Sequence, residues 1–177
     1  MELPFDRTWW VEEGSLLAGP YPGSADLASA QTKLRALLAG GIRTFVSLLE
    51  PDETNYAGHP FAAYEDELRD MAAAAGVDVE LHRYPIPDYG IVGPEAIRRV
   101  LDTIERSIAE GRPVYLHCWG GHGRTGTIVG CRLRESGLDG EEALARIAEL
   151  RQHSPYLRSM DSPQTDRQQE VVRNWSA

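Results

Sequence analysis

A glycine-rich stretch two thirds of the way along the chain holds the residues best suited to chemistry. It reads His117-Cys118-Trp119-Gly120-Gly121-His122-Gly123-Arg124-Thr125-Gly126. Its glycines let the backbone curl until successive N–H groups point inward, and a helix predicted to begin at Arg124 adds the positive end of its dipole. Arg124 can also donate two parallel hydrogen bonds to two phosphate oxygens. The stretch is therefore predicted to bind a phosphate group.

Cys118 is the candidate nucleophile of this loop. A cysteine that ends a strand is usually a small core residue, but here the inward N–H groups would stabilise its thiolate. The Thr125 hydroxyl is expected to hydrogen-bond the same sulfur, and His117 is expected to hold the loop from behind. Trp119 and His122 are expected to project from the loop rim. The residues expected to bind substrate are Trp119, Gly120, Gly121, His122, Gly123 and Arg124.

The same residues resemble a known family. Cys118, five residues and then Arg124-Thr125-Gly126 resemble the signature loop of the protein-tyrosine-phosphatase superfamily, and the resemblance extends over most of the chain. It implies the single-domain α/β fold of that superfamily and hydrolysis through a phosphocysteine intermediate. We expect no metal ion and no other cofactor.

The resemblance also requires an aspartic acid on an upstream loop, which protonates the leaving oxygen. Asp88 lies thirty residues before Cys118, just after a predicted strand and among turn residues. It matches the acid loop of the family in order and spacing. Asp78 and Asp102 are less well placed, because they fall on a predicted strand and a predicted helix. Asp88 is therefore the candidate general acid, and a plain surface turn is the alternative.

A second family feature lies near the C-terminus. Gln164-Thr165, two residues and then Gln168 resemble the glutamine segment of strictly tyrosine-specific phosphatases, whose first glutamine positions the hydrolytic water. The resemblance gives that role to Gln164 and a supporting role to Gln168. The alternative is that these polar residues only cap and open a helix.

The resemblance defines the branch and the substrate of the phosphatase less closely than it defines the superfamily. The short chain resembles the dual-specificity branch, and its loop resembles the kinase-associated phosphatase subgroup, although Thr125 replaces the serine common in dual-specificity loops. A phosphorylated protein or a small phosphate ester is the expected partner. Phytase-like enzymes with related Gly-Arg-Thr loops make inositol phosphate the alternative substrate. Lipid is disfavoured, since Trp119 and His122 occupy rim positions where phosphoinositide phosphatases carry lysines.

Two other classes of function are open to a glycine-rich phosphate loop. A nucleotide-binding loop is disfavoured, because no Gly-Lys-Ser or Gly-Lys-Thr follows the glycines. A phosphate-reading interaction module without turnover is also disfavoured, because Cys118, Arg124 and Asp88 are all intact.

The loop needs a framework of strands and helices, which the hydrophobic pattern supplies. Residues 9–23 are rich in turn residues and are predicted to form short strands. Further strands are predicted at residues 42–49, 77–84 and 113–117. Helices are predicted at residues 27–38, 61–75, 94–110, 124–136, 141–151 and 164–174. Strands alternating with helices indicate an α/β fold with a central, mostly parallel sheet flanked by helices. We expect one phosphatase domain over residues 1–177, with residues 1–24 as a strand-and-turn segment packed on it.

Composition limits the classes of partner and the cellular location that we expect. The 177 residues are 42% hydrophobic and 25% charged, which is typical of a soluble globular domain, and the net charge is −9. A strongly negative chain disfavours nucleic acid and anionic membranes as partners. The two cysteines, Cys118 and Cys131, are too few for a disulfide framework, and Cys131 is expected in the core. The N-terminal sequence lacks the pattern of a signal peptide, so we expect a cytoplasmic protein.

Overall fold

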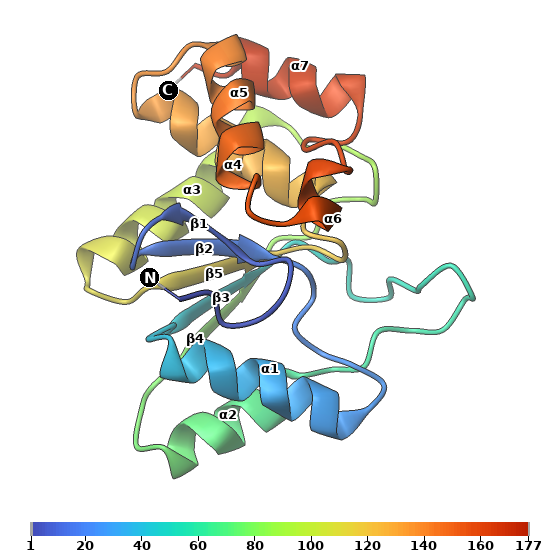
Figure 1. The fold of residues 1–177 in the computed structure, drawn as a ribbon, viewed down its shortest axis with the longest axis vertical. Coiled ribbons are helices and arrows are strands. Elements are labelled where there is room, and N and C mark those ends of the chain that lie inside the picture. The colour runs from blue at the N-terminus through green and yellow to red at the C-terminus, as the bar shows by residue number, and fades with distance from the viewer. Residues whose placement is uncertain (1, 177) are drawn as a thin grey trace.

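The computed structural model describes residues 2–176 as a five-stranded sheet covered by helices on both faces (Figure 1). The strands are β1 (Trp9–Glu12), β2 (Leu16–Gly19), β3 (Thr44–Ser47), β4 (Glu80–Arg83) and β5 (Val114–His117). Their order across the sheet is β1-β2-β5-β3-β4. Only the edge pair of β1 and β2 is antiparallel, so the predicted mostly parallel sheet is confirmed.

Helices form a layer on each side of this sheet. They are α1 (Leu27–Ala39), α2 (Glu65–Ala74), α3 (Pro94–Ala109), α4 (Gly123–Glu135), α5 (Gly140–Leu150), α6 (Pro155–Arg158) and α7 (Asp166–Asn174). Helices α1 and α2 cover one face, and the remaining helices lie on the other (Figure 1). Each layer buries its own apolar cluster against the sheet. Within residues 2–176, no helix has the length and apolar character needed to cross a membrane.

Helix α3 illustrates how the sequence specifies these layers. Pro94 occupies its first turn, where the missing N–H has no intrahelical partner to lose. Its buried residues recur at helical spacing on one face, and they include Ile97, Leu101 and Ile104. Gly111 follows the helix with a φ of 70°, a conformation that favours glycine and ends the helix.

The elements differ from the predicted ones mainly at their ends. The strands are shorter, and α2 begins at Glu65 rather than at residue 61. Helix α7 begins at Asp166 because Thr165 caps it, so Gln164 precedes the helix. Helix α6 was not predicted: its four residues, capped by Ser154, are too few to show a hydrophobic period.

Four parallel strands end in register at one edge of the sheet. Gly19 and Ser47 both pair with His117, and Ser47 also pairs with Arg83. Segments that follow the carboxyl ends of parallel strands meet at a common edge, where α/β proteins bind ligands. Here these segments are residues 20–23, 48–53, 84–90 and 118–122.

Candidate active site

The loop that carries Cys118 follows β5 directly and is fixed by close backbone contacts. Gly121 has a φ of 76°, and a Cβ atom there would lie 2.5 and 2.6 Å from the carbonyl carbon and oxygen of Gly19. Only glycine suits both the conformation and the approach. The backbone N–H of Tyr21 donates to the Trp119 carbonyl at 2.9 Å. The loop is therefore held against the segment that follows β2.

Arg124 lies in the first turn of α4, with its guanidinium buried among acceptors. Nη1 and Nη2 donate to the two carboxylate oxygens of Glu53 at 2.6 and 2.8 Å, and Nη1 also donates to the Ile86 carbonyl at 3.1 Å. The side chain of Arg124 is 1% exposed and that of Glu53 is 8% exposed. Burial is the largest single influence and opposes the charge, but the hydrogen bonds to Glu53 and the nearby acidic groups of Cys118, Glu53 and Asp88 together outweigh it and raise the pKa of Arg124.

Glu53 is a residue of this site that the sequence did not reveal. It belongs to the polar segment after β3, which extends away from the body of the protein in Figure 1. Its position could have indicated a place in the site, because an acidic residue soon after a central parallel strand lies near the edge of the sheet where the loops meet.

Asp88 lies beside Arg124, in the irregular segment between β4 and α3. Its Oδ1 is 3.0 Å from Arg124 Nη2, and its side chain is 34% exposed. The next residue, Tyr89, has a φ of 55°, and its hydroxyl lies 2.7 Å from that of Tyr56. Asp88 and Cys118 line the same cavity, so the segment places a carboxylic acid near the thiol.

The two C-terminal glutamines meet the nucleophile loop. Gln164 lines the same cavity as Cys118. Gln168 is fully buried: its amide donates to the Gly90 carbonyl at 3.0 Å, and its oxygen accepts from the backbone N–H of Gln164 at 3.1 Å. Gln168 also completes the capping box with Thr165. Gln168 thus joins the start of α7 to the segment that carries Asp88.

Three glycines of α4 make this approach possible. Gly123, Gly126 and Gly130 face the C-terminal segment, and a Cβ atom on any of them would overlap a neighbouring side chain. The neighbours are, in that order, Gln164 with Gln168, Ser162, and Val172. At Gly123 the added atom would lie 2.8 Å from Gln164 Oε1. The loop and the glutamines are therefore in contact through a face without side chains.

His117 is fully buried behind the loop, where it was expected. Nδ1 lies 3.2 Å from the Cys118 carbonyl, which can only accept, so Nδ1 carries the hydrogen. Nε2 lies 2.7 Å from the Tyr64 hydroxyl and accepts from it. Burial lowers the pKa of His117 to about 3, which keeps the ring neutral.

The sequence suggested that His122 projects from the loop rim, but the structure buries it. Arg151 Nη2 donates to the Nδ1 of its ring at 2.6 Å. Burial, then the Arg151 charge, lowers the pKa of His122 to about 4. The hydrogen is therefore on Nε2, which is buried without a partner in the described part of the chain. Trp119 is half-buried at the rim, with ring centroids 4.4 Å from Tyr56 and 5.4 Å from Phe61.

Two other residues near the loop are in the core. The Thr125 hydroxyl is buried and has no hydrogen-bond partner among residues 2–176, so the expected bond to the Cys118 sulfur is not made here. This side chain lies on the buried face of α4. Cys131 is also fully buried, and burial raises the pKa of its thiol to about 12. The prediction that Cys131 is a core residue is confirmed.

The candidate reaction cavity has a volume of about 460 Å³. It is lined by Arg7, Pro20, Tyr21, Gly23, Lys33, Tyr56, Asp88, Tyr89, Cys118, Trp119, Gly120, His122, Arg124, Tyr156, Met160 and Gln164. The cavity therefore brings together the predicted nucleophile, phosphate ligand, acid and water-positioning residue. Within residues 2–176, no group of three or more His, Cys, Asp or Glu side chains is arranged to hold a metal ion.

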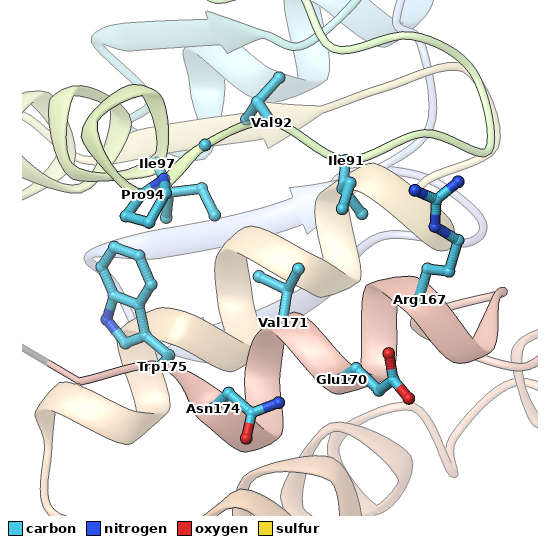
Figure 2. Close-up of a pocket in the computed structure, with 10 residues that line it drawn as sticks. Ile91, Val92, Pro94, Ile97, Arg167, Glu170, Val171, Asn174 and Trp175 are labelled. Carbon is cyan, nitrogen blue, oxygen red and sulfur yellow. The ribbon is translucent and has the colours of Figure 1, made fainter.

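A second cavity, of about 590 Å³, lies between α7 and the segment that leads into α3. Figure 2 shows Val171 of α7 and Trp175, which directly follows α7, directed toward that segment, with Arg167 near Ile91 at one end. Its lining is mostly apolar and includes no cysteine. It is therefore distinct from the cavity that holds Cys118.

The chain is similar in sequence to a phosphatase-domain family and to two curated proteins. A family model described as Swiss Army Knife protein, DSP-PTPase phosphatase domain, matches residues 7–172. Protein tyrosine phosphatase domain-containing protein 1 of Mus musculus is 30% identical over 129 residues, which cover 70% of this chain and 16% of that protein. Uncharacterized protein MJECL20 of Methanocaldococcus jannaschii is 43% identical over 58 residues, or 33% of this chain and 37% of that protein. The chain thus spans well under half the length of these curated relatives.

Solved structures agree over nearly the whole chain. Tk-PTP in its active form has a TM-score of 0.71 and 26% identity, and the match covers 97% of both chains. Kinase-associated phosphatase has a TM-score of 0.69 at 18% identity, and covers 97% of this chain and 94% of its own. PTPMT1 in complex with PI(5)P has a TM-score of 0.69 at 20% identity, with coverage of 96% and 94%. The last two show a common fold.

The predicted superfamily and enzyme class are thereby confirmed. The family match includes β2, β5 and the loop that begins at Cys118, and the solved structures share the sheet that positions this loop. The chain belongs to the DSP-PTPase phosphatase family and is a protein-tyrosine-phosphatase-like phosphatase.

Proposed function

We propose that the chain hydrolyses phosphate monoesters through a covalent phosphocysteine at Cys118. In the first step, the Cys118 thiolate attacks phosphorus while Arg124 and the N–H groups of the loop hold the phosphate oxygens. The P–O bond to the leaving group breaks as an S–P bond forms. Asp88 gives its proton to the leaving oxygen, so the product departs as an alcohol or phenol.

The second step returns the enzyme to its starting state. A water molecule held by Gln164 attacks phosphorus and gives a proton to the Asp88 carboxylate, and the S–P bond breaks to release inorganic phosphate and the thiolate. An amide suits this role, because it can donate and accept hydrogen bonds but is too weak a base to take the proton itself. Gln168 supports Gln164 through the bond to its backbone N–H.

One observation carries the proposal: Cys118 and Arg124 of the nucleophile loop line one cavity with Asp88 and Gln164, which come from two other segments of the chain. The test is hydrolysis of an aryl phosphate by Cys118→Ser, which keeps the loop and Arg124 but weakens the nucleophile. We expect loss of turnover with retained binding of vanadate. Cys131→Ala, a cysteine outside the cavity, is the matched control and should stay active. Activity of Cys118→Ser within tenfold of the wild type would disprove the mechanism.

The same mechanism implies independence from divalent metal. Activity in the presence of a chelator should equal activity without it, because each proposed step uses a side chain of the chain itself. A loss of activity with the chelator that added zinc or magnesium reverses would argue against the phosphocysteine route.

We further propose a cytoplasmic location, since the reaction needs Cys118 as a free thiol and neither cysteine is in a disulfide.

The substrates of the solved relatives differ. One relative was crystallised with PI(5)P, and SIW14 of S. cerevisiae, at a TM-score of 0.66, is a PP-IP phosphatase. Family membership supports action on phosphotyrosine and on other monoesters, including phosphorylated proteins. The cavity contains further charges, from which we infer the substrate class below.

A further inference from the structure

The wall of the reaction cavity carries more positive charge than the removal of one phosphate requires. Arg7 and Lys33 line it together with Cys118 and Arg124. The charge of Arg124 is already balanced by the carboxylates of Glu53 and Asp88. Among the described residues that line the cavity, Asp88 is the only one with a carboxylate, so the lining has no second carboxylate for Arg7 and Lys33. The whole chain has a net charge of −9. Two cations in this wall are therefore unusual for the protein and are not explained by the proposed chemistry.

Lys33 is held close to the nucleophile loop. It lies half-buried on α1, and its Nζ donates to the Gly23 carbonyl at 2.9 Å. Gly23 belongs to the short segment in which the Tyr21 N–H donates to the carbonyl of Trp119. An ammonium group carries three N–H donors, so two remain for a ligand in the cavity.

Arg7 is held at the same cavity in an unusual conformation. Its φ is 65°, in the left-handed region that residues other than glycine rarely adopt. Its guanidinium carbon lies 5.1 Å from the ring centroid of Tyr156, whose ring is 5.6 Å from that of His122. Its ion pair is with Asp6, 3.9 Å from Nε, and that side chain is 82% exposed. Arg7 therefore presents donors to the cavity with only a weak, solvated counter-charge.

The two cations also act on each other. Burial lowers the pKa of Lys33, and the charge of Arg7 lowers it further. Like charges on a half-buried wall repel, and an anion between them would relieve that repulsion. A cavity of about 460 Å³ suits a small molecule. Because Arg7 and Lys33 line the same cavity as Cys118, one small molecule can present an anion to them and a phosphate to Cys118.

We propose that Arg7 and Lys33 form a second anion subsite, so that the preferred substrate is a small polyol phosphate with at least one phosphate besides the one removed. The inference rests on the proposed function, because it assumes that the first phosphate binds at Cys118. Phosphotyrosine offers one phosphate and leaves this subsite without a ligand group. Soluble inositol phosphates and phosphoinositide headgroups share the required chemistry.

The test compares specificity rather than activity. For each variant, kcat/KM is measured on an inositol bisphosphate and an inositol monophosphate, and the ratio of the two values is taken. Arg7→Gln and Lys33→Gln should each lower this ratio about tenfold, the usual effect of one charge-assisted hydrogen bond. Arg35→Gln, an exposed change on the same helix as Lys33, should keep the wild-type ratio. Partial unfolding cannot mimic the result, because it lowers both values equally.

Further arms identify the source of the second phosphate and separate the two proposals. The lipid headgroup is tested with a phosphoinositide bisphosphate and its monophosphate in phosphatidylcholine vesicles. A fall in the ratio of kcat/KM values for Arg7→Gln and Lys33→Gln, with either the soluble or the lipid substrates, supports the subsite. A wild-type ratio in both variants would refute it, as would a dependence on Arg7 and Lys33 found only with doubly phosphorylated peptides. Turnover of an aryl phosphate by Cys118→Ser would instead refute the proposed function.

Discussion

Arg124 and Glu53 form a buried pair in which two nitrogens of one guanidinium donate to both oxygens of one carboxylate. The pair joins the first turn of α4 to the segment after β3 and fixes the plane of the guanidinium. Asp88 approaches the same group from a third segment, at 3.0 Å from Nη2. A phosphate that binds Arg124 must therefore share the guanidinium with Glu53 and compete with Asp88 for Nη2.

Glu53→Gln should impair both phosphate binding and stability. The amide replaces only one of two charged acceptors, so the guanidinium loses its fixed plane, and we expect kcat/KM for an aryl phosphate to fall about 10- to 100-fold. A buried charge that loses its partner should also lower the free energy of unfolding by roughly 2–4 kcal/mol. Asp52→Asn, an exposed neighbour, is the control. Wild-type affinity for vanadate in folded Glu53→Gln would reduce Glu53 to a purely structural role.

Asp88→Asn should slow the reaction most for substrates whose leaving oxygen must be protonated before it departs. With alkyl phosphates, whose leaving groups are poor, kcat should fall by about 10² to 10⁴, the usual worth of a positioned general acid. The loss should be much smaller with nitrophenyl phosphate, whose leaving group departs without protonation. Asp102→Asn on α3 should leave both rates as they are. Equal losses on the two substrates would show that the acid is another residue.

Gln164→Ala should act on the second step alone. Slower hydrolysis of the phosphocysteine leaves its formation intact, so rapid mixing should show a larger burst of leaving group followed by a slower steady rate. Thr165→Ala is the matched comparison, because Thr165 caps α7: it should cost about 1 kcal/mol of stability but keep the wild-type burst. If Gln164→Ala instead melts lower with unchanged kinetics, another group holds the water.

Two buried histidines should make stability depend on pH. The native pKa values, about 3 for His117 and about 4 for His122, lie below the ordinary value of about 6.5 that applies to the unfolded chain. As the pH falls below that value, the unfolded chain binds protons that the native protein cannot, so stability is complete above it and declines toward pH 4.

Urea denaturation between pH 7 and pH 5 measures this slope. His117→Asn and His122→Asn should each flatten it by removing up to one proton from the difference between the two states. His59→Asn, on an exposed loop, should keep the wild-type slope. A slope that neither buried variant changes would mean that both rings titrate normally in the native protein.

The sequence predicted best what is local in the chain. The nucleophile loop is contiguous, so its residues and their spacing identify it without a fold. The alternation of strands and helices likewise predicted the α/β class. Glu53 and Arg7 lie in ordinary polar segments and Lys33 lies on α1, so nothing local in the sequence marks them, and only the fold brings them near Cys118. His122 was misplaced for the same reason, since its partner Arg151 lies beyond the end of α5.

The side-chain-free face of α4 has a consequence for variation among homologues. Gly123 leaves room for Gln164 and Gln168, and a larger residue at position 123 would displace both. Positions 123, 164 and 168 should therefore change together: a relative with a side chain at the first should lack the glutamine pair and recruit its hydrolytic water by other means. An alignment of many relatives would show this as covariation, and the identity of one loop residue would then indicate how a given relative completes its second step.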